Sequence, residues 1–294
     1  MYSIGIDIGG MSAKIGVVSG AELIHQVRIP TSSDLDYAAF LQQLCGVILE
    51  LKQKYPLKKV GISSCGLIDR AKGTIVWSNN IRWDNKPIAS DIQEQTGLPV
   101  FIANDAKCAA LAEAVLGAGK HYKRVCMITL GTGVGGGFIR DKRLDAADRY
   151  ADADGILGHI TVERDGRPCT CGRKGCLESY ASATAIMQTY QERTGLSLTA
   201  YEIFQRAAAG ENAATETVAQ FQYYLAEGLA SLGNVLRPDV IVLGGGVAGS
   251  AELFLPYLRS QVNKSIFGGE LLPIAIETAE LGNDAGILGA TLLD

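Results

Sequence analysis

Three glycine-rich stretches, each directly after an apolar strand pattern, constrain the fold of this chain most. They are Asp7-Ile8-Gly9-Gly10, Gly131-Thr132-Gly133-Val134-Gly135-Gly136-Gly137 and Gly244-Gly245-Gly246. Glycine lets successive backbone N–H groups converge on an anion, because it adopts unusual dihedral angles and permits close approach. One glycine pair alone is more often a simple turn. Three such loops at strand ends are harder to explain as turns, and they indicate phosphate binding.

The strand patterns around the first two glycine stretches repeat. Residues 2–8 alternate apolar with small or polar side chains, which is typical of a strand with one buried face. Extended sequence resumes at 15–18, so a hairpin with a glycine-rich turn is expected. A second hairpin is expected from 125–130 and 138–139 around the second stretch. Because helical patterns follow both hairpins, the chain is expected to be a weak internal duplication of two α/β lobes.

Apolar periodicity and turn residues predict the remaining elements. Helices are expected near 37–54, 106–116, 178–193, 213–236 and 284–293, and further strands at 59–63, 100–103 and 240–243. The small residues Gly117-Ala118-Gly119 suggest a boundary, giving an N-terminal lobe over 1–117 and a C-terminal lobe over 118–283. The helix within 284–294 is expected to pack back on the first lobe, although the pattern alone does not show this.

Composition excludes several classes of protein. The chain has 294 residues, 47% of them hydrophobic and 20% charged, which suits a packed two-lobed enzyme. A formal charge of −4 without a long basic run gives little attraction to nucleic acid or anionic lipid. The first residues lack the basic start of a signal peptide, and no apolar run reaches the length of a membrane span. A cytoplasmic protein without nucleic-acid or membrane partners is therefore expected.

One histidine and three of the seven cysteines form a metal-binding pattern. His159, Cys169, Cys171 and Cys176 have the spacing H-x9-C-x-C-x4-C, which is typical of a closed tetrahedral zinc site, and the loop 159–176 contains glycines that allow it to fold around a metal. The alternative is a set of incidental or reactive thiols. Four cysteines lie scattered in apolar sequence and are expected to be buried thiols: Cys45, Cys65, Cys108 and Cys126.

Four polar residues are candidates for chemistry, each with a structural alternative. Asp7 could hold the hydration shell of Mg²⁺ at the first glycine loop. Thr132 could offer a hydroxyl in the second glycine loop, or it could be a turn residue that bonds its own backbone. Asp105, after the strand at 100–103, could take a proton from a hydroxyl or could cap the following helix. Glu178 could accept bonds from sugar hydroxyls beside the metal loop, or could be favoured only by the helix dipole.

Together, these motifs closely resemble the ROK family of bacterial sugar kinases and repressors, nearly from end to end. The motifs that carry the resemblance are the three glycine stretches, Asn104-Asp105, Gly158-His159 and the segment from Cys169 to Glu178. The resemblance implies an α/β, two-lobed actin-like ATPase (ribonuclease H-like) fold with an interlobe cleft and a structural zinc loop. It also implies ATP, Mg²⁺ and Zn²⁺, a homodimer, and phosphoryl transfer to the 6-hydroxyl of a hexose or related sugar.

The resemblance assigns roles residue by residue. Asp105 matches the catalytic base, and the sugar contacts are matched by Gly66, Asn104, Asp105, His159 and Glu178. The nucleotide and its phosphates are expected at Asp7, Gly9, Gly10, Ser12, Gly131, Thr132, Gly133, Gly244, Gly245 and Gly246. The zinc ligands are expected to be His159, Cys169, Cys171 and Cys176.

Three departures from the family pattern bear on the substrate. Ile156 stands where the family usually has a glutamate that grips hydroxyls near C1 and C2 of the sugar, residues 149–154 lack the usual glycines, and Met11-Ser12 replaces Thr-Lys. Exchange of a carboxylate for isoleucine predicts a preference for a sugar modified at C1 or C2 over plain glucose. A sugar-sensing binding protein without turnover is the alternative function, whereas a zinc hydrolase is disfavoured because four protein ligands leave zinc no open position.

Overall fold

The computed structural model describes residues 2–32, 34–78, 80–144 and 155–294, and these fold as two compact units. Unit 1 comprises the described residues of Met1–Gly117, Lys142–Gly155 and Asn283–Asp294. Unit 2 comprises the described residues of Ala118–Asp141 and Ile156–Gly282. Each unit contains a β-sheet with helices packed on it, which confirms the predicted α/β class. Residues 149–154, whose lack of glycines was noted from the sequence, lie outside the described residues.

Unit 1 is built on a five-stranded sheet in the order β3-β2-β1-β4-β8. Its strands are β1 (Tyr2–Ile8), β2 (Ser12–Ser19), β3 (Glu22–Pro30), β4 (Leu57–Ser64) and β8 (Val100–Asn104). The pair β1–β2 is the predicted hairpin, and β3 extends it by a strand that the sequence reasoning did not include. β4 runs parallel to both β1 and β8. The carboxyl ends of these three parallel strands therefore share one edge of the sheet.

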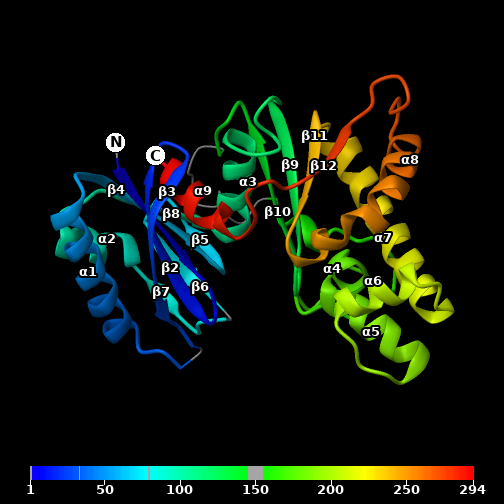
Figure 1. Cartoon of the computed structure of the whole chain (residues 1–294), viewed down its shortest axis with the longest axis horizontal. Helices are drawn as coiled ribbons and strands as arrows, with labels where there is room; N and C mark the ends of the chain where they lie inside the picture. The colour runs from blue at the N-terminus through cyan, green and yellow to red at the C-terminus, as the bar shows by residue number, and fades with distance from the viewer. Residues whose placement is uncertain (1, 33, 79, 145–154) are drawn as a thin grey trace. The chain divides into compact units, whose positions relative to one another are not determined.

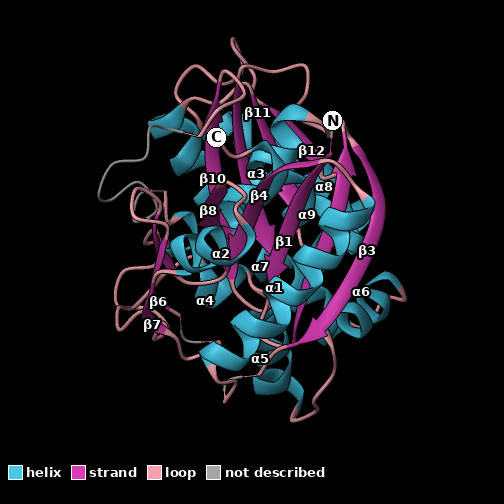
Figure 2. Cartoon of the chain, turned by 90° about the vertical axis from the view of Figure 1, so that its left-hand side faces the viewer, coloured by secondary structure: helices cyan, strands magenta, loops and turns pink. Residues whose placement is uncertain are grey.

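Helices cover both faces of this sheet (Figure 1). α1 (Tyr37–Lys54) and α2 (Ile88–Thr96) lie on one face, and α3 (Asp105–Val115) and α9 (Ala285–Leu292) on the other. Asp36 caps α1, because its carboxylate accepts the Ala39 N–H at 2.9 Å. Phe40 and Ile48 of α1 are fully buried in the core of unit 1. Figure 2 shows these helices and strands after a quarter turn of the view, coloured by secondary structure.

Two strand glycines allow α9 to lie directly on the sheet of unit 1. A Cβ on Gly5 would overlap the carbonyl oxygen of Ile287, and a Cβ on Gly61 would overlap that of Ala290. Only glycine leaves room for so close an approach of backbone to backbone. The last helix of the chain, red in Figure 1, therefore completes the core of the unit that the first strand begins.

A small three-stranded sheet, in the order β5-β6-β7, also belongs to unit 1. Its strands are β5 (Leu67–Asp69), β6 (Thr74–Trp77) and β7 (Asp84–Lys86). Gly66 immediately precedes β5 and has a φ of 109°, and a Cβ there would overlap the carbonyl oxygen of Trp77. Only glycine therefore fits at this position beside the neighbouring strand.

Unit 2 repeats the plan of an antiparallel hairpin joined to parallel strands, in the order β10-β9-β11-β12. The strands are β9 (Arg124–Leu130), β10 (Val134–Arg140), β11 (Val240–Gly244) and β12 (Ala275–Thr278). The α-helices are α4 (Glu178–Ala181), α5 (Ala183–Thr194), α6 (Ala200–Ala208), α7 (Asn212–Leu236) and α8 (Leu255–Ser265). Short 3₁₀ helices occur at Leu157–His159 and Gly246–Leu253, and a third at Gly282–Asp284 spans the passage of the chain from unit 2 to unit 1. Buried rings of Phe204, Phe221 and Phe254 pack together in the core.

The single helix predicted over 178–193 is wrong, because Ser182 divides it into α4 and α5. Ser182 has an extended backbone with φ −82° and ψ 161°. Its hydroxyl oxygen accepts the N–H of Ala185 at 3.1 Å, so it acts as the N-cap of α5. The apolar periodicity continues across the break, which is why the pattern alone did not reveal it.

Candidate active site and metal centre

Strand register brings the predicted polar residues of unit 1 to one edge of the sheet. Asp7 of β1 lies opposite Ser63 of β4, and Ser64 lies opposite Asn104 of β8. Asp105 follows Asn104 directly. Asp7 and Asp105 therefore stand two strands apart, or about 10 Å at the usual strand spacing. The carboxyl edge of parallel strands is the common ligand-binding position in open α/β sheets.

Asp7 is held from three sides. The Ser63 hydroxyl donates to Asp7 Oδ1 at 2.9 Å, and the Lys14 ammonium lies 3.5 Å from Oδ2. Gly286, in the first turn of α9, has no room for a Cβ against the carboxylate. Sequence reasoning found Asp7 but missed Ser63 and Lys14, although the alternation of β2 places Lys14 opposite Asp7. Asp7 is therefore a fixed anion at the end of β1.

The first glycine loop closes as a tight turn between β1 and β2. The Gly9 N–H donates to the carbonyl oxygen of Ser12 at 3.1 Å. The Thr31 hydroxyl donates to the carbonyl oxygen of Gly9 at 2.6 Å. Gly10 and Ser12 are half-buried, whereas the side chain of Met11 is 88% exposed. Met11 therefore adds an apolar chain at the surface of this loop.

Asn104, and not Asp105, caps α3. Asn104 Oδ1 accepts the Ala106 N–H at 3.0 Å, and its Nδ2 donates to the carbonyl oxygen of Gly66 at 3.1 Å. The alternative that Asp105 is the N-cap of this helix is therefore wrong. The N-cap is Asn104, and Asp105 is the first residue of the helix. Asp105 Oδ1 shares the Ala106 N–H at 2.9 Å. Asn104 thus links Gly66 to the start of α3, next to Asp105.

Asp105 is an exposed residue, yet protein atoms crowd its carboxyl group. Its residue has an exposed surface, so a substrate can reach it. Surrounding protein atoms raise the pKa of the carboxyl to about 6, mainly through desolvation and to a smaller extent through the negative charge of Asp7. Hydrogen bonds from the backbone and from Asn104 act in the opposite direction. A carboxylate with a pKa near neutral is suited to general base catalysis.

In unit 2, the second and third glycine loops lie at the same edge of their sheet. Gly244 at the end of β11 lies opposite Thr129 near the end of β9. The Gly131 N–H donates to the carbonyl oxygen of Gly133 at 3.0 Å, which closes the hairpin loop. Gly245 has a φ of 84° and no room for a Cβ against the backbone of Leu130.

A hollow of about 400 Å³ opens beside these two loops. Gly131, Thr132 and Gly246 line it, and the exposed Tyr201 of α6 adds aromatic surface, with the buried Phe204 behind it. A pocket that combines an aromatic ring with two glycine loops can accept a planar base and its phosphates. Sequence reasoning missed the contribution of α6, because nothing in its local pattern distinguishes these aromatic residues from core residues.

The break at Ser182 serves the second glycine loop. It frees the Ala183 N–H, which donates to the carbonyl oxygen of Gly131 at 2.8 Å. The Thr184 hydroxyl donates to the carbonyl oxygen of Thr132 at 2.8 Å. The start of α5 therefore fixes the two peptide groups at the tip of the hairpin.

The structure assembles the four predicted zinc ligands. Atoms of His159, Cys169, Cys171 and Cys176 that could bind a metal all lie within 4.8 Å of one another. The sulfurs of Cys171 and Cys176 are 3.6 Å apart, and His159 Nδ1 is 3.5 Å from the sulfur of Cys169. Zn–S bonds of about 2.3 Å at tetrahedral angles separate two sulfurs by about 3.8 Å. The group therefore fits a zinc ion, and the four scattered cysteines are buried as predicted.

Glu178 connects the metal loop to the second glycine loop. Its Oε2 accepts the Val134 N–H at 3.0 Å, and its Oε1 accepts from the Thr170 hydroxyl at 3.1 Å. Gly133 has no room for a Cβ against this carboxylate. Ile156 is 48% exposed, and its carbonyl oxygen accepts the His159 N–H at 3.1 Å. Glu178, His159 and Ile156 therefore belong to one framework around the ligand group.

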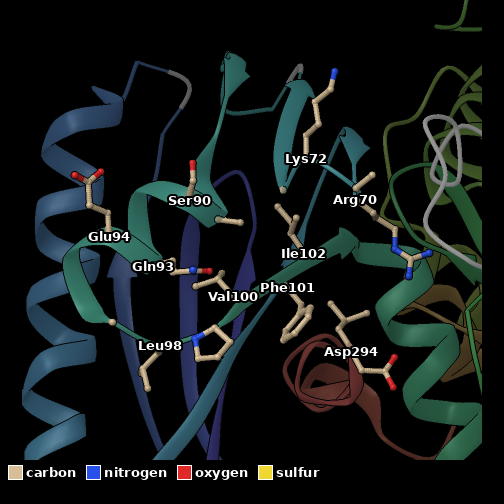
Figure 3. A pocket seen from close by; sticks show the side chains of 16 residues that line it. Arg70, Lys72, Ser90, Gln93, Glu94, Leu98, Val100, Phe101, Ile102 and Asp294 are labelled. Atoms are coloured by element: carbon tan, nitrogen blue, oxygen red, sulfur yellow. The ribbon is translucent and has the colours of Figure 1, made fainter.

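A larger hollow in unit 1, of about 830 Å³, is not the predicted site (Figure 3). It lies along the edge strand β8, and its lining includes Arg70 and Phe101 together with the C-terminal Asp294. Among the described residues that line it, none is a predicted site residue. Its size alone therefore does not mark it as the place of the chemistry.

Comparison with known proteins agrees with this fold. The ROK family profile matches residues 3–294. A glucokinase of Halalkalibacterium halodurans is 34% identical, over 98% of this chain and 93% of the relative. The ROK hexokinase of Thermus thermophilus superposes with a TM-score of 0.86 at 33% identity, over 99% and 97% of the two chains. The ROK family glucokinase of Streptomyces griseus, in complex with glucose and AMPPNP, superposes with a TM-score of 0.81 at 30% identity, over 99% and 98%.

These findings define the protein as a carbohydrate kinase with an actin-like ATPase fold. The chain belongs to the ROK family. Relatives in this family differ in what they act on. An N-acetylgalactosamine kinase of a Shewanella strain is 32% identical over 98% of this chain and 95% of the relative, and the xylose repressor of Bacillus subtilis is 29% identical over 98% and 75%. Within the described part of the chain, none of the helices combines the length and apolar character that a membrane crossing requires.

Proposed function

We propose that this kinase transfers the γ-phosphoryl group of ATP to the 6-hydroxyl of a hexose, an N-acylhexosamine or a glycoside, with Asp105 as the base. The observation that carries the proposal is the placement of Asp105, an exposed residue at the same sheet edge as Asp7, whose carboxyl pKa is raised to about 6 by desolvation. The residues proposed to contact the sugar are Gly66, Asn104, Asp105, His159 and Glu178.

In the proposed reaction, the sugar hydroxyl oxygen attacks the γ-phosphorus of ATP. A new P–O bond forms, the bond from the γ-phosphorus to the β–γ bridging oxygen breaks, and ADP departs with that oxygen. The hydroxyl proton passes to the carboxylate of Asp105. Asn104, held by its bond to Gly66, orients a neighbouring hydroxyl, so the attacking oxygen is aligned before the phosphate arrives.

The glycine loops are proposed to bind the nucleotide. The base and ribose would occupy the hollow beside Tyr201 and Phe204, and the phosphates would face the N–H groups near Gly131–Gly133 and Gly244–Gly246. Gly9, Gly10 and Ser12 would also contact the phosphates. Mg²⁺ bound with ATP would reduce the negative charge on the phosphates, and Asp7 would hold it through water molecules.

Zinc is proposed to organise the sugar site. His159 would bind it through Nδ1, the atom that faces Cys169, which leaves Nε2 as the ring nitrogen for a sugar hydroxyl. When bound, the ion would supply a rigid tetrahedral anchor, since four protein ligands fill its coordination shell. Glu178, two residues after Cys176, would then point its carboxylate at sugar hydroxyls.

The exposed side chain of Ile156 supports a preference for a modified sugar. It presents apolar surface one turn from His159, at a position where a carboxylate would accept hydrogen bonds from sugar hydroxyls. A substituent at C1 or C2, such as an N-acyl group, can pack on this surface, whereas free hydroxyl groups there lose a partner. Plain glucose is therefore expected to be a poorer substrate than a sugar that carries such a substituent.

A panel of sugars with ATP tests the proposal. Glucose, N-acetylmannosamine, allose and a β-glucoside are incubated with the protein and Mg²⁺, and the products are read by mass and by ADP release. We expect one phosphate to be added to at least one modified sugar. Glucose as clearly the best substrate would contradict the specificity, and sugar binding without phosphorylation of any panel member would favour the sugar-sensing alternative.

A further inference from the structure

Trp77, in the small sheet of unit 1, is an exposed aromatic residue to which neither the motifs nor the reaction scheme gives a role. It is 56% exposed. The other tryptophan of the chain, Trp83, is 3% exposed, and its ring N–H donates to the carbonyl oxygen of Leu35 at 3.2 Å. Burial of so large a ring stabilises a fold, and a tryptophan at the surface gives up much of that gain. Trp77 is therefore a candidate for contact with a ligand.

A β-bulge turns Trp77 away from the core. In the pairing of β5 with β6, Ile68 lies opposite Ile75. Leu67, the residue before Ile68, lies opposite Trp77, so Val76 is an extra residue in β6. Without this residue in excess, Trp77 would share the face of the fully buried Ile75. With it, Trp77 shares a face with Leu67, which is 38% exposed, and the sheet presents two adjacent apolar side chains to solvent.

The Leu67–Trp77 pair lies beside residues that are proposed to contact the sugar. Leu67 directly follows Gly66, whose carbonyl oxygen accepts from Asn104 Nδ2 at 3.1 Å. The carbonyl oxygen of Trp77 fills the space that a Cβ on Gly66 would need. The backbone of both strands is thus packed against the loop that contacts Asn104. Single apolar residues at a surface need no explanation, but an adjacent pair at the edge of a proposed ligand site favours an apolar ligand group.

This arrangement leads to an inference that rests on the proposed function and narrows its substrate class. We propose that Leu67 and Trp77 form a subsite for an apolar group on C1 of the sugar, so that the substrate is a glycoside with an apolar aglycone, such as an alkyl β-glucoside. The 6-hydroxyl and a group on C1 leave the sugar ring at separate carbons, so Asp105 and the subsite can be occupied together. An alkyl chain that lies on the indole ring removes apolar surface of both from water, whereas a free hydroxyl at C1 gains nothing there.

Binding of two matched glucosides without ATP tests the inference. Methyl β-glucoside and hexyl β-glucoside carry the same sugar and differ only in the length of the alkyl chain. We expect the hexyl compound to bind the unmodified protein roughly tenfold more tightly, because part of the longer chain is buried. It should also shift the tryptophan emission to shorter wavelength, since Trp77 is the exposed one of the two tryptophans.

Variants assign the preference to the pair. In Trp77→Ala the preference for the hexyl compound is expected to fall below about twofold, whereas Trp77→Phe keeps a ring and should retain most of it without the emission shift. Leu67→Ala is expected to reduce it by about two- to threefold. Leu49→Ala is the matched control, because Leu49 of α1 is 41% exposed but lies outside the small sheet, and it should leave the preference unchanged.

Several outcomes would overturn the inference. These are equal affinity for the two glucosides in the unmodified protein, no binding of the hexyl compound, and an unchanged preference in Trp77→Ala. A change of oligomeric state in Trp77→Ala, measured by sedimentation, together with an unchanged preference would assign the pair to contact with a second copy instead. If Trp77→Ala does not fold, Trp77→Thr replaces it with the same expected loss.

The inference and the proposed function can fail separately. A protein that prefers the hexyl glucoside through Trp77 but phosphorylates no sugar would refute the proposed function alone. Phosphorylation of a panel sugar, with no preference for the hexyl over the methyl glucoside, would refute the inference alone.

Discussion

The site residues of unit 1 and those of unit 2 are held in place by different means. In unit 1, Asp7, Asn104 and Asp105 stand at the ends of parallel strands, so the register of the sheet fixes them. In unit 2, the zinc-ligand group lies on a segment with a 3₁₀ turn at Leu157–His159 and isolated bridges such as Thr161 with Cys176. A sheet positions residues without a ligand, whereas an irregular loop would gain rigidity from a bound metal. The two sites are therefore expected to fail in different ways.

The largest expected effect is a loss of stability from Gly61→Ala in unit 1. The new Cβ would overlap the carbonyl oxygen of Ala290, so α9 must move away from the sheet. Such overpacking is expected to cost roughly 3 kcal/mol of the free energy of unfolding. Urea denaturation followed by far-UV circular dichroism measures this cost.

Gly46→Ala is the matched control for Gly61→Ala. Gly46 is an exposed residue inside α1, and a Cβ there meets nothing within 4 Å. Alanine favours a helix over glycine by about 0.5–1 kcal/mol, so this variant is expected to be slightly more stable than the unmodified protein. If both variants shifted stability equally, the direct packing of α9 on the sheet would not be what holds unit 1 together.

The next effect belongs to the metal loop. Cys176→Ser removes a fully buried ligand, so the zinc content is expected to fall well below one ion per chain. Because Glu178 and His159 lose their anchor, the KM for the sugar is expected to rise roughly 10- to 100-fold. Elemental analysis and steady-state kinetics measure the two changes. Cys45→Ser, which lies outside the ligand group, is the control and should retain the metal. If Cys176→Ser lost its zinc but kept full activity, the loop would not be needed for sugar binding.

The smallest of these effects is a change of rate with pH. The pKa of Asp105 is raised above its usual value to about 6, and the base acts only when it is deprotonated. The ratio kcat/KM should therefore fall about tenfold for each pH unit below 6 and level off above it. Rates measured between pH 4.5 and pH 8, with zinc content checked at each pH, test this. A midpoint near pH 4 would show that the carboxyl is fully hydrated in the free enzyme.

The same contrast explains what the sequence could predict. Alternation along β1 and the apolar run of β8 placed Asp7 and Asp105 at strand ends, because both patterns are local properties of the sequence. The ligand spacing of the zinc loop was equally clear in the sequence. The break at Ser182 was not, because it is stabilised by the bond from the Ala183 N–H to Gly131, a partner about fifty residues away. Tyr201 and Phe204 were missed for the same reason, since only the fold brings α6 beside the glycine loops.

Paired binding and turnover measurements on Asp105→Asn test the central claim most directly. The amide is nearly the same shape as the carboxyl, but it cannot accept the hydroxyl proton. Calorimetry should give a sugar affinity within about threefold of the unmodified protein, while kcat on the best sugar of the panel should fall by roughly 10²- to 10⁴-fold. Unimpaired turnover in this variant, with sugar binding intact, would contradict the account, because the proton would then have to leave by a route that does not involve residue 105.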